Sequence, residues 1–433
     1  MHSKKHLGFC GLRNTIARRF EHIPDDRQEH KVEHRLYDCL MSAFAMMFFQ
    51  DPSILSFQQR LQDSIQRNNL QTIFNISSIP KDTQLRDIID PLPIEPLNTI
   101  FQDFLAHLQK GKYLTDYQLL GGKYLISVDG SEYFTSEKIH CPSCLKKESG
   151  KKVRFHHQIL QAVIVHPDKR QVLPLAPEPI RNTDGTKKQD CEINAGKRII
   201  NKIRKAHPKL NIIITADGLY SKQPFVDQLK DAGMSFILVA KPKDHKILFE
   251  WANELIQLGA GGNFAYTDAK GRKHCYRWLN EVPLNGSKDA DNINFFEYQI
   301  VTDGKITYRN SWVTDILIDE HNIVTLVKAG RARWKIENET FNTLKNQGYH
   351  LEHNFGHGKQ NLSNIFFVLN LLAFYVHQIL ELTDRLYQNV RYTKFTSRKE
   401  FWNQLRCTIR ILLFPRWVSL LQFILDPESG IPP

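Results

Sequence analysis

Two apolar runs in this chain each stop at the dipeptide Asp-Gly. Residues 123–128 read Lys-Tyr-Leu-Ile-Ser-Val and precede Asp129, and residues 211–216 read Asn-Ile-Ile-Ile-Thr-Ala and precede Asp217. Each run has the length and the β-branched content of a buried strand. A carboxylate at the end of such a strand is costly to desolvate unless a cation or hydrogen bonds compensate its charge. If the two strands are neighbours, both carboxylates lie at one edge of a sheet, as in many divalent-metal sites.

The chain around these runs alternates strands and helices. We expect helices at 190–206 and 221–232, and strands at 124–128, 155–165, 171–175, 211–217 and 234–240. The second and third strands are separated by a turn of hairpin length at 166–169. This order matches the ribonuclease-H-like α/β layout, in which the first and fourth strands are adjacent, so Asp129 and Asp217 would meet. That step is an analogy at the level of the fold.

The whole chain of 433 residues is too long for one simple core. We predict an α/β fold in which a ribonuclease-H-like core is interrupted by a β-rich insertion, with helices at both ends. The expected parts are a helical, DNA-binding segment 1–110, the first part of the core 111–240, the insertion 241–326, the second part of the core 327–388 and a helical tail 389–433.

The net charge of +12 fits a polyanionic partner such as nucleic acid or an anionic membrane, although an unrelated basic protein would also show it. Arginines in the first segment could form a basic surface for a duplex, or only the solvated face of a helical bundle, because no clean helix-turn-helix signature appears. These arginines are Arg13, Arg18, Arg19, Arg35, Arg60, Arg67 and Arg86.

The N-terminus lacks the apolar core of a secretory signal. The most hydrophobic segment, 362–380, carries several polar residues and is better explained as a buried helix than as a membrane span. Seven cysteines are scattered along the chain, which favours reduced thiols or a metal site over a disulfide framework. We therefore expect a cytoplasmic protein with no membrane partner.

A third acidic residue lies in the expected helix 331–345. Trp334, Glu337, Phe341 and Leu344 are spaced so that they share one helix face, and Glu337 interrupts an apolar stripe there. Glu339 falls on another face and is expected to be solvated. Two interpretations of Glu337 stay open: an ion pair with Arg333, four residues earlier, or a metal ligand beside an Arg333 that contacts phosphate.

These features together resemble the DDE transposases of bacterial insertion sequences, specifically the insertion-sequence-four-like group. The resemblance is carried by Asp129, Asp217, the β-rich insertion and the motif Arg333-Trp-Lys-Ile-Glu337, and it extends from about residue 30 to 382. It includes Asp-Thr-Gln-Leu-Arg at 82–86 and Tyr-His-Leu-Glu-His-Asn-Phe-Gly-His-Gly at 349–358.

The resemblance implies that Asp129, Asp217 and Glu337 are catalytic and hold two Mg²⁺ (or Mn²⁺) ions. The implied reaction is hydrolysis at transposon ends followed by strand transfer into target DNA, performed on double-stranded DNA by a homodimer. Two alternatives stay open. One is a catalytically inactive or repurposed DNA-binding protein of the same fold, and the other is a ribonuclease-H-like nuclease without strand transfer.

The resemblance also implies DNA contacts by Arg333, Lys345, Trp312, His357 and Lys359. The family has a tyrosine three residues before the arginine and a lysine seven residues after the glutamate, where this chain has Gly330 and Leu344. Lys345 comes one residue late, about 100° around a helix. It can serve only if the helix carries an irregularity; otherwise another residue contacts the phosphate. Trp312 could stack on an unpaired or flipped base, or be a core residue.

A second metal site is suggested by His140-Cys141-Pro-Ser-Cys144, which is followed by His156-His157 and by Cys191. A Cys-x-x-Cys knuckle with one further His and one further Cys satisfies a tetrahedral structural zinc site. The expected ligands are Cys141, Cys144, His157 and Cys191. The alternative is a polar turn that carries ordinary reduced thiols.

Overall fold

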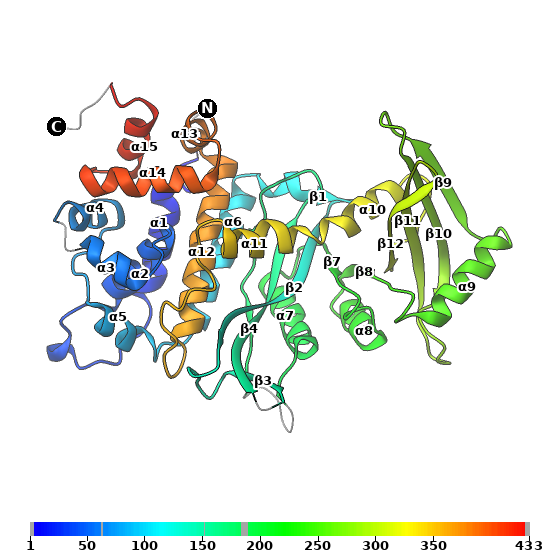
Figure 1. The fold of residues 1–433 in the computed structure, drawn as a ribbon, viewed down its shortest axis with the longest axis horizontal. Helices are drawn as coiled ribbons and strands as arrows, with labels where there is room; N and C mark the ends of the chain where they lie inside the picture. Colours follow the sequence, from blue (N-terminus) through cyan, green and yellow to red (C-terminus); the bar gives the residue numbers. More distant parts are fainter. Residues whose placement is uncertain (1–3, 62–63, 151, 183–188, 429–433) are drawn as a thin grey trace.

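The computed structural model describes residues 4–61, 64–150, 152–182 and 189–428. Figure 1 shows an elongated molecule. The helices of the N- and C-terminal segments lie together at one end, the strands around β2 and β7 form the middle, and β9–β12 with α9 form the other end. The two ends of the chain, far apart in sequence, thus belong to one helical region.

The helical region is built around α12 (Leu362–Thr383), which packs against α1, α2, α5 and α6. The N-terminal helices are α1 (Phe9–Glu21), α2 (Leu36–Phe48), α3 (Ile54–Leu61), α4 (Ser64–Phe74), α5 (Asp82–Ile89) and α6 (Glu95–Lys110), with short 3₁₀ turns at Glu29–Lys31 and Leu114–Tyr117. The C-terminal helices are α13 (Arg385–Lys394), α14 (Arg398–Ile411) and α15 (Trp417–Leu425). Asp384 and Ser397 cap α13 and α14 with their side chains, as their residue types favour.

Helix α12 is long and apolar enough to cross a membrane, but 94% of its most apolar window is buried inside the protein. Its polar residues find partners there: Asn370 donates to the carbonyl of Tyr349 over 2.8 Å, and His377 Nδ1 lies 2.6 Å from the Tyr349 hydroxyl. This is the environment of a core helix, as the polar residues in the sequence indicate.

One mixed sheet of twelve strands runs through the described part of the chain, in the order β3-β4-β2-β7-β8-β12-β11-β10-β9. β1, β5 and β6 pair at its side with β2 or β4. The first eight strands are β1 (Gln118–Leu119), β2 (Lys123–Ser136), β3 (Leu145–Ser149), β4 (Lys152–Val165), β5 (Leu173–Pro174), β6 (Glu178–Ile180), β7 (Ile212–Ala216) and β8 (Ser235–Val239). The helices between them are α7 (Glu192–Ala206) and α8 (Gln223–Asp231).

Strand β2 differs from the expectation that it stops at Asp129. Its parallel pairing with β7 ends at Ser127 and Thr215, but β2 continues to Ser136 as the antiparallel partner of β4. Asp129 therefore lies within a strand, at the point where one neighbour ends and the other remains. The apolar run marks the part of β2 that is buried on both faces. Beyond it, buried and partly exposed residues are mixed.

Within 241–326 the described chain forms four strands, which extend the central sheet, and the helix α9. These elements are α9 (Lys246–Gln257), β9 (Gly262–Thr267), β10 (Lys273–Pro283), β11 (Asn292–Thr302) and β12 (Lys305–Thr314). β12 joins the core strand β8 in antiparallel register, with Trp312 opposite Val239.

The helix after the insertion begins earlier than expected and is not regular. It starts as α10 (Ile323–Ala332), continues through a turn at 333–334 and a π-helical stretch Ile336–Phe341, and ends as α11 (Asn342–Asn346). The interior of this helix lies against β2, since the hydroxyl of Ser127 donates to the carbonyl of Arg333 over 3.0 Å.

Candidate active site

Asp129 lies in β2, and Asp217 directly follows β7, the parallel neighbour of β2. β2 and β7 pair Ile126 with Ile214 and Ser127 with Thr215, and each aspartate follows two residues later. Adjacent strands are about 4.8 Å apart, and residues two apart point to the same face. Both aspartates are half-buried. Asp217 begins a turn in which its Oδ1 accepts the backbone N–H of Leu219 over 2.9 Å.

The Arg333 side chain contacts both Glu337 and Asp129. The Nη1 atom of Arg333 lies 2.9 Å from Glu337 Oε1 and 3.9 Å from Asp129 Oδ2. The Arg333 side chain is only 8% exposed, so one largely buried guanidinium bridges the two acids. The simple ion pair between Glu337 and Arg333 is therefore present, and it lies beside Asp129.

The π-helical stretch changes which residues share a helix face. Trp334 is 48% exposed, with the Arg333 guanidinium 4.8 Å from the centre of its ring, whereas Ile336 and Leu344 are fully buried. The expectation that Trp334 belongs to the apolar stripe is thus wrong. A regular helix places residues every 100°, and a π turn takes about one extra residue.

The same extra residue bears on Lys345, which comes one residue later than the family pattern has its lysine. One added residue in a π turn compensates for this offset. After such a turn, position 345 points where position 344 would point in a regular α-helix. Lys345 forms an ion pair with Glu352 over 2.9 Å. Its contact with DNA stays a prediction.

Charge and burial are in conflict at Asp129. Burial raises the pKa of Asp129 to about 7; the Arg333 guanidinium opposes this rise, and the nearby carboxylates of Glu337 and Glu192 add to it. The pKa of the Tyr220 hydroxyl is raised by burial and by the negative charges of Glu192, Asp217 and Asp129. Asp129, Asp217 and Glu192 are thus all close enough to Tyr220 to raise the pKa of its hydroxyl.

Glu192 is an acid of this environment that the sequence did not reveal. It begins α7, and its Oε1 accepts the Tyr220 hydroxyl over 3.1 Å while its Oε2 accepts the Gln158 amide over 3.2 Å. A side chain on Gly130 would collide with the Glu192 carboxylate. Burial raises the pKa of Glu192, and the charge of Asp217 adds to the rise. The only local signal was a glutamate in the first turn of an expected helix, which is an ordinary position.

Trp312 is fully buried and stacks on Phe296 with the ring centres 5.2 Å apart. A Cβ atom at Gly330 would lie 2.7 Å from the Trp312 indole. The glycine that departs from the family pattern therefore makes room for this tryptophan. In this arrangement Trp312 is a core residue and is not available to a base, whereas Trp334 is exposed beside Arg333.

The remaining candidate DNA contacts lie in the loop that follows α11. Lys359 is exposed, and its backbone N–H donates to Asp90 over 2.8 Å. His357 is only 7% exposed and faces inward, so the structure does not present it to DNA. Its Nε2 lies 3.1 Å from His157 Nε2 and 3.3 Å from Cys144 Sγ.

Cys141, Cys144 and His157 converge as expected, but the fourth member of their cluster is His357. Cys191 is exposed at the N-terminus of α7 and is not part of the cluster. The expectation for Cys191 rested on its place in the sequence after the hairpin. The fourth residue instead comes from the loop that carries His357, 200 residues after His157 in the sequence.

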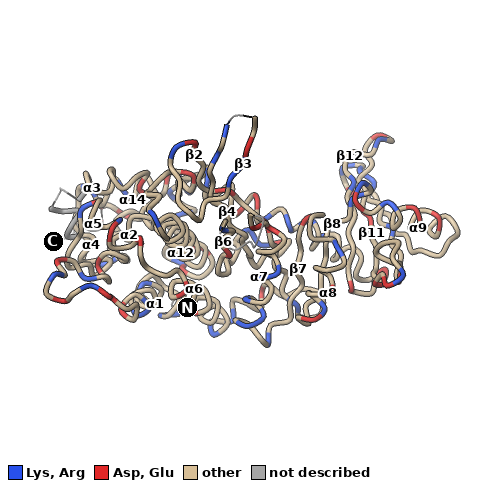
Figure 2. Tube along the Cα trace, turned by 90° about the horizontal axis from the view of Figure 1, so that it is seen from below, with Lys and Arg blue, Asp and Glu red and all other residues tan. Residues whose placement is uncertain are grey.

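The arginines of the N-terminal segment are partly neutralised. The observed pairs are Arg19 with Asp103 at 2.7 Å, Arg35 with Asp38 at 3.2 Å and Arg86 with Asp82 at 3.1 Å. The side chains of Arg60 and Arg67 lie outside the described residues. Figure 2 shows basic and acidic residues interleaved along much of the chain. DNA binding by this segment stays a prediction.

The sequence matches the family described as Transposase DDE domain over residues 122–375, which is more than half of the chain. The chain belongs to this transposase family. The matched span contains Asp129, Asp217 and Glu337, the insertion and most of α12. No curated protein matches the chain.

DDE transposases generally use divalent metal ions, and the acids of this family member suit such ions. Their donors are carboxylate oxygens, which Mg²⁺ and Mn²⁺ prefer. The donor chemistry therefore suits a divalent cation. In this structure the Arg333 guanidinium is the cation that lies at Glu337 and Asp129.

Proposed function

We propose that this protein is a DNA transposase that cleaves transposon ends and transfers the strands into target DNA, with Asp129, Asp217 and Glu337 as its catalytic acids. The observation that carries the proposal is the single Arg333 guanidinium, 2.9 Å from Glu337 and 3.9 Å from Asp129, on the helix that packs across β2. The parallel pairing of β2 with β7, which ends two residues before Asp129 and Asp217, supports the second aspartate.

The three acids would hold two Mg²⁺ or Mn²⁺ ions, which supply activation of a water and stabilisation of the leaving oxygen. Arg333 would keep Glu337 oriented beside Asp129. Its guanidinium suits planar, two-point contacts with phosphate, but it is only 8% exposed, so such a contact would require DNA to displace part of its surroundings. The freed 3′-hydroxyl would then attack the target strand, without a covalent bond between protein and DNA. Lys345 and Lys359 would contact the phosphate backbone. Trp312, a buried core residue, would act only by packing against the helix at Gly330.

Further features of the proposal follow from the family and the topology. We infer a ribonuclease-H-like core, membership of the insertion-sequence-four-like group, double-stranded DNA as substrate and a homodimer on that DNA. The order β4-β2-β7-β8, with β2 parallel to β7 and β7 parallel to β8, supports the inference about the core.

An active enzyme is favoured over an inactive relative of the same fold. Gly330 and the one-residue delay of Lys345 were the departures that suggested loss of activity. A glycine at position 330 leaves room for the Trp312 indole. The π turn at Ile336–Phe341 is consistent with a lysine that comes one residue later in the sequence. Neither departure therefore requires a lost activity.

The test uses the purified chain, the DNA that flanks its gene and Mg²⁺. Asp129→Asn, Asp217→Asn and Glu337→Gln should each lower cleavage and strand joining by at least about 100-fold, a loss typical for removal of a group that stabilises the transition state. Binding to the end sequences should remain, and should weaken steeply with salt because counterions are released.

Glu339→Gln is the matched control, because Glu339 lies on the same helix but pairs with Arg170 at 3.7 Å. It should cleave like the unmodified chain. Substantial cleavage by any one of the three acid variants would remove that residue from the site. Cleavage without strand joining by the unmodified chain would instead favour a nuclease.

A further inference from the structure

We propose that Cys141, Cys144, His157 and His357 form a structural zinc site. It would clamp the loop after α11 to strand β4 and to the connection between β2 and β3. The four ligand atoms lie within 4.8 Å of one another, and all four residues are buried. Cysteine thiolate and histidine nitrogen in equal number are a common zinc donor set. The inference is independent of the proposed reaction.

Five of the six separations between the ligand atoms are close to those of a tetrahedron around zinc, and the sixth, between Cys141 Sγ and His357 Nε2, is within 4.8 Å. With bonds of about 2.3 Å to sulfur and about 2.0 Å to nitrogen, tetrahedral angles require separations of about 3.8 Å for S–S, about 3.5 Å for S–N and about 3.3 Å for N–N. The two sulfurs are 3.8 Å apart, His157 Nε2 is 3.6 Å from each sulfur, His357 Nε2 is 3.3 Å from Cys144 Sγ, and the two nitrogens are 3.1 Å apart.

The hydrogen bonds around the cluster suit a metal rather than a disulfide. His357 Nδ1 lies 2.9 Å from the carbonyl of Gly358, so it must carry the proton in this contact and leave the lone pair of Nε2 directed into the cluster. The S–S distance of 3.8 Å is far from the bond length of about 2.0 Å. The two thiols are therefore free, with two imidazoles aimed at them.

The cluster is enclosed by aromatic rings of β2. The ring of Tyr133 stacks on His157 with the centres 5.9 Å apart, and the ring of Phe134 lies 4.6 Å from that of His357. Buried sulfur and imidazole nitrogen atoms in such apolar surroundings need a polar or charged partner. A single Zn²⁺ would do so for all four.

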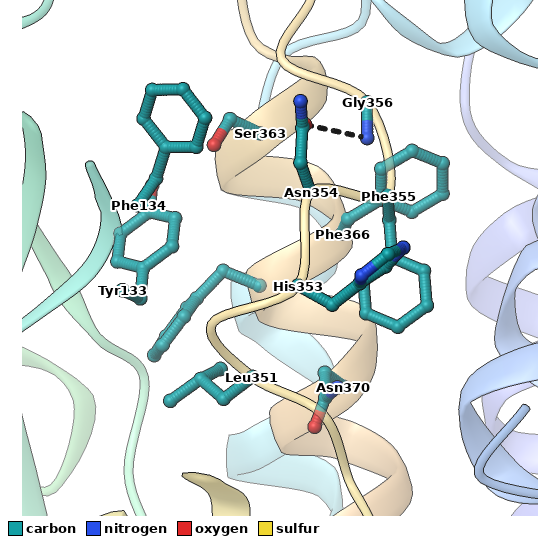
Figure 3. A pocket seen from close by; sticks show the side chains of 11 residues that line it. Tyr133, Phe134, Leu351, His353, Asn354, Phe355, Gly356, Ser363, Phe366 and Asn370 are labelled. Atoms are coloured by element: carbon teal, nitrogen blue, oxygen red, sulfur yellow. Dashed lines mark hydrogen bonds between the residues drawn. The ribbon is translucent and has the colours of Figure 1, made fainter. Parts of the chain in front are cut away.

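The proposed site joins segments that otherwise meet across a pocket. Figure 3 shows the loop from Leu351 to Gly356 lying along α12, with Tyr133 and Phe134 of β2 on its other side; these residues line one pocket. At its far end the loop is held by Asp90, whose carboxylate accepts four consecutive backbone N–H groups from Lys359 to Leu362. Zinc bound by His357, two residues before Lys359, would hold this same end of the loop from the side of the sheet.

The test measures metal content by mass spectrometry on the full chain, purified without added zinc and without chelators. We expect one zinc per chain for the unmodified protein and for Cys191→Ser, and less than about a tenth of that for Cys144→Ser and His357→Ala. Replacement by Co²⁺ should give the visible absorption of a tetrahedral site with two thiolates. Removal of zinc should speed hydrogen exchange in residues 351–358.

Zinc well below one per chain in the unmodified protein, together with no cobalt absorption after reconstitution, would overturn the proposal. So would loss of zinc from Cys191→Ser. Both measurements on the unmodified chain remain decisive if a ligand variant fails to fold. Neither depends on DNA cleavage, so the zinc site and the proposed reaction can fail separately.

Discussion

At Asp129, folding and the proposed metal binding make opposite demands on one carboxylate. The side chain is 20% exposed, and the carboxylates of Glu337 and Glu192 are near enough to raise its pKa, with Arg333 as the opposing charge. Burial and like charge favour the protonated form, whereas a metal ligand must be ionised. The resulting pKa of about 7 means that the two demands are balanced near neutral pH.

This balance predicts a pH-dependent stability. A carboxyl group whose pKa is raised on folding binds its proton more tightly in the folded state, so its ionisation costs stability as the pH rises from about 4 to about 7. Asp129→Asn removes that cost. We expect it to stabilise the metal-free chain by on the order of 1–3 kcal/mol at pH 8 compared with its effect at pH 4, measured by urea unfolding.

Asp116→Asn serves as the control, because Asp116 is exposed and pairs with Lys169 at 3.4 Å. It should show no such difference between the two pH values. Mg²⁺ should raise the melting temperature of the unmodified chain at pH 8 but not that of the Asp129 variant. An equal effect of Asp129→Asn at both pH values would contradict the assignment of a raised pKa.

At the scale of elements, the helix that carries Glu337 is the decisive one. It is α-helical at both ends and π-helical from Ile336 to Phe341, directly beside the acids. π turns are rare, and they often mark functional sites where one residue has been added to an α-helix. The stretch keeps Phe341 and Leu344 buried while Glu337 contacts Arg333.

An added residue can be removed with little damage to the rest of the helix. Deletion of Asn338, which is exposed within the π turn, should convert the turn to α-helix and leave Leu344 and Lys345 in their present directions. We expect a folded chain whose melting temperature changes by only a few degrees, measured by circular dichroism. Activity is expected to fall, because Glu337 is moved relative to Asp129.

Deletion of Lys328 is the matched control, since Lys328 is exposed in the regular helix α10. Its loss rotates the following residues by about 100° and turns buried side chains toward water. That variant should be much less stable or unfolded. If the Asn338 deletion proves equally damaging, the π turn is not the site of an added residue.

In the whole molecule, the two ends of the chain form one helical region with a shared core. Phe9 near the N-terminus stacks on Trp417 near the C-terminus, with ring centres 4.9 Å apart. The side chain of Asn69 donates to the carbonyls of Ile409 and Leu412 over 3.0 and 2.7 Å and accepts the N–H of Phe414 over 2.8 Å. The segments 1–110 and 389–433 are therefore not independent of each other.

Asn69→Ala should accordingly destabilise the whole chain. The variant loses three hydrogen bonds and leaves backbone groups of the C-terminal segment without partners, a cost of about 2–4 kcal/mol. Urea unfolding measures this loss, and hydrogen exchange should increase in both end segments. Asn346→Ala, at an exposed asparagine, is the control. A loss below about 0.5 kcal/mol for Asn69→Ala would mean that the segments fold separately.

Local patterns in the sequence determined the elements and the acids among them. The apolar runs before Asp129 and Asp217 define β2 and β7, because a strand buried on both faces must be continuously apolar. The polar residues of segment 362–380 likewise indicated a buried helix. The assignment of Glu337 needed both helical spacing and the resemblance to a family, and its catalytic role is still a prediction.

The tertiary structure decided what local patterns do not encode. Sequence spacing suggested Cys191 as a zinc ligand, but His357 arrives at the cluster from a loop far along the chain. Glu192 is near the acids because the start of α7 places its carboxylate against Gly130. Trp312 is buried because Gly330 leaves room for it. Such contacts depend on how distant segments pack, whereas the periods of strands and helices depend only on near neighbours.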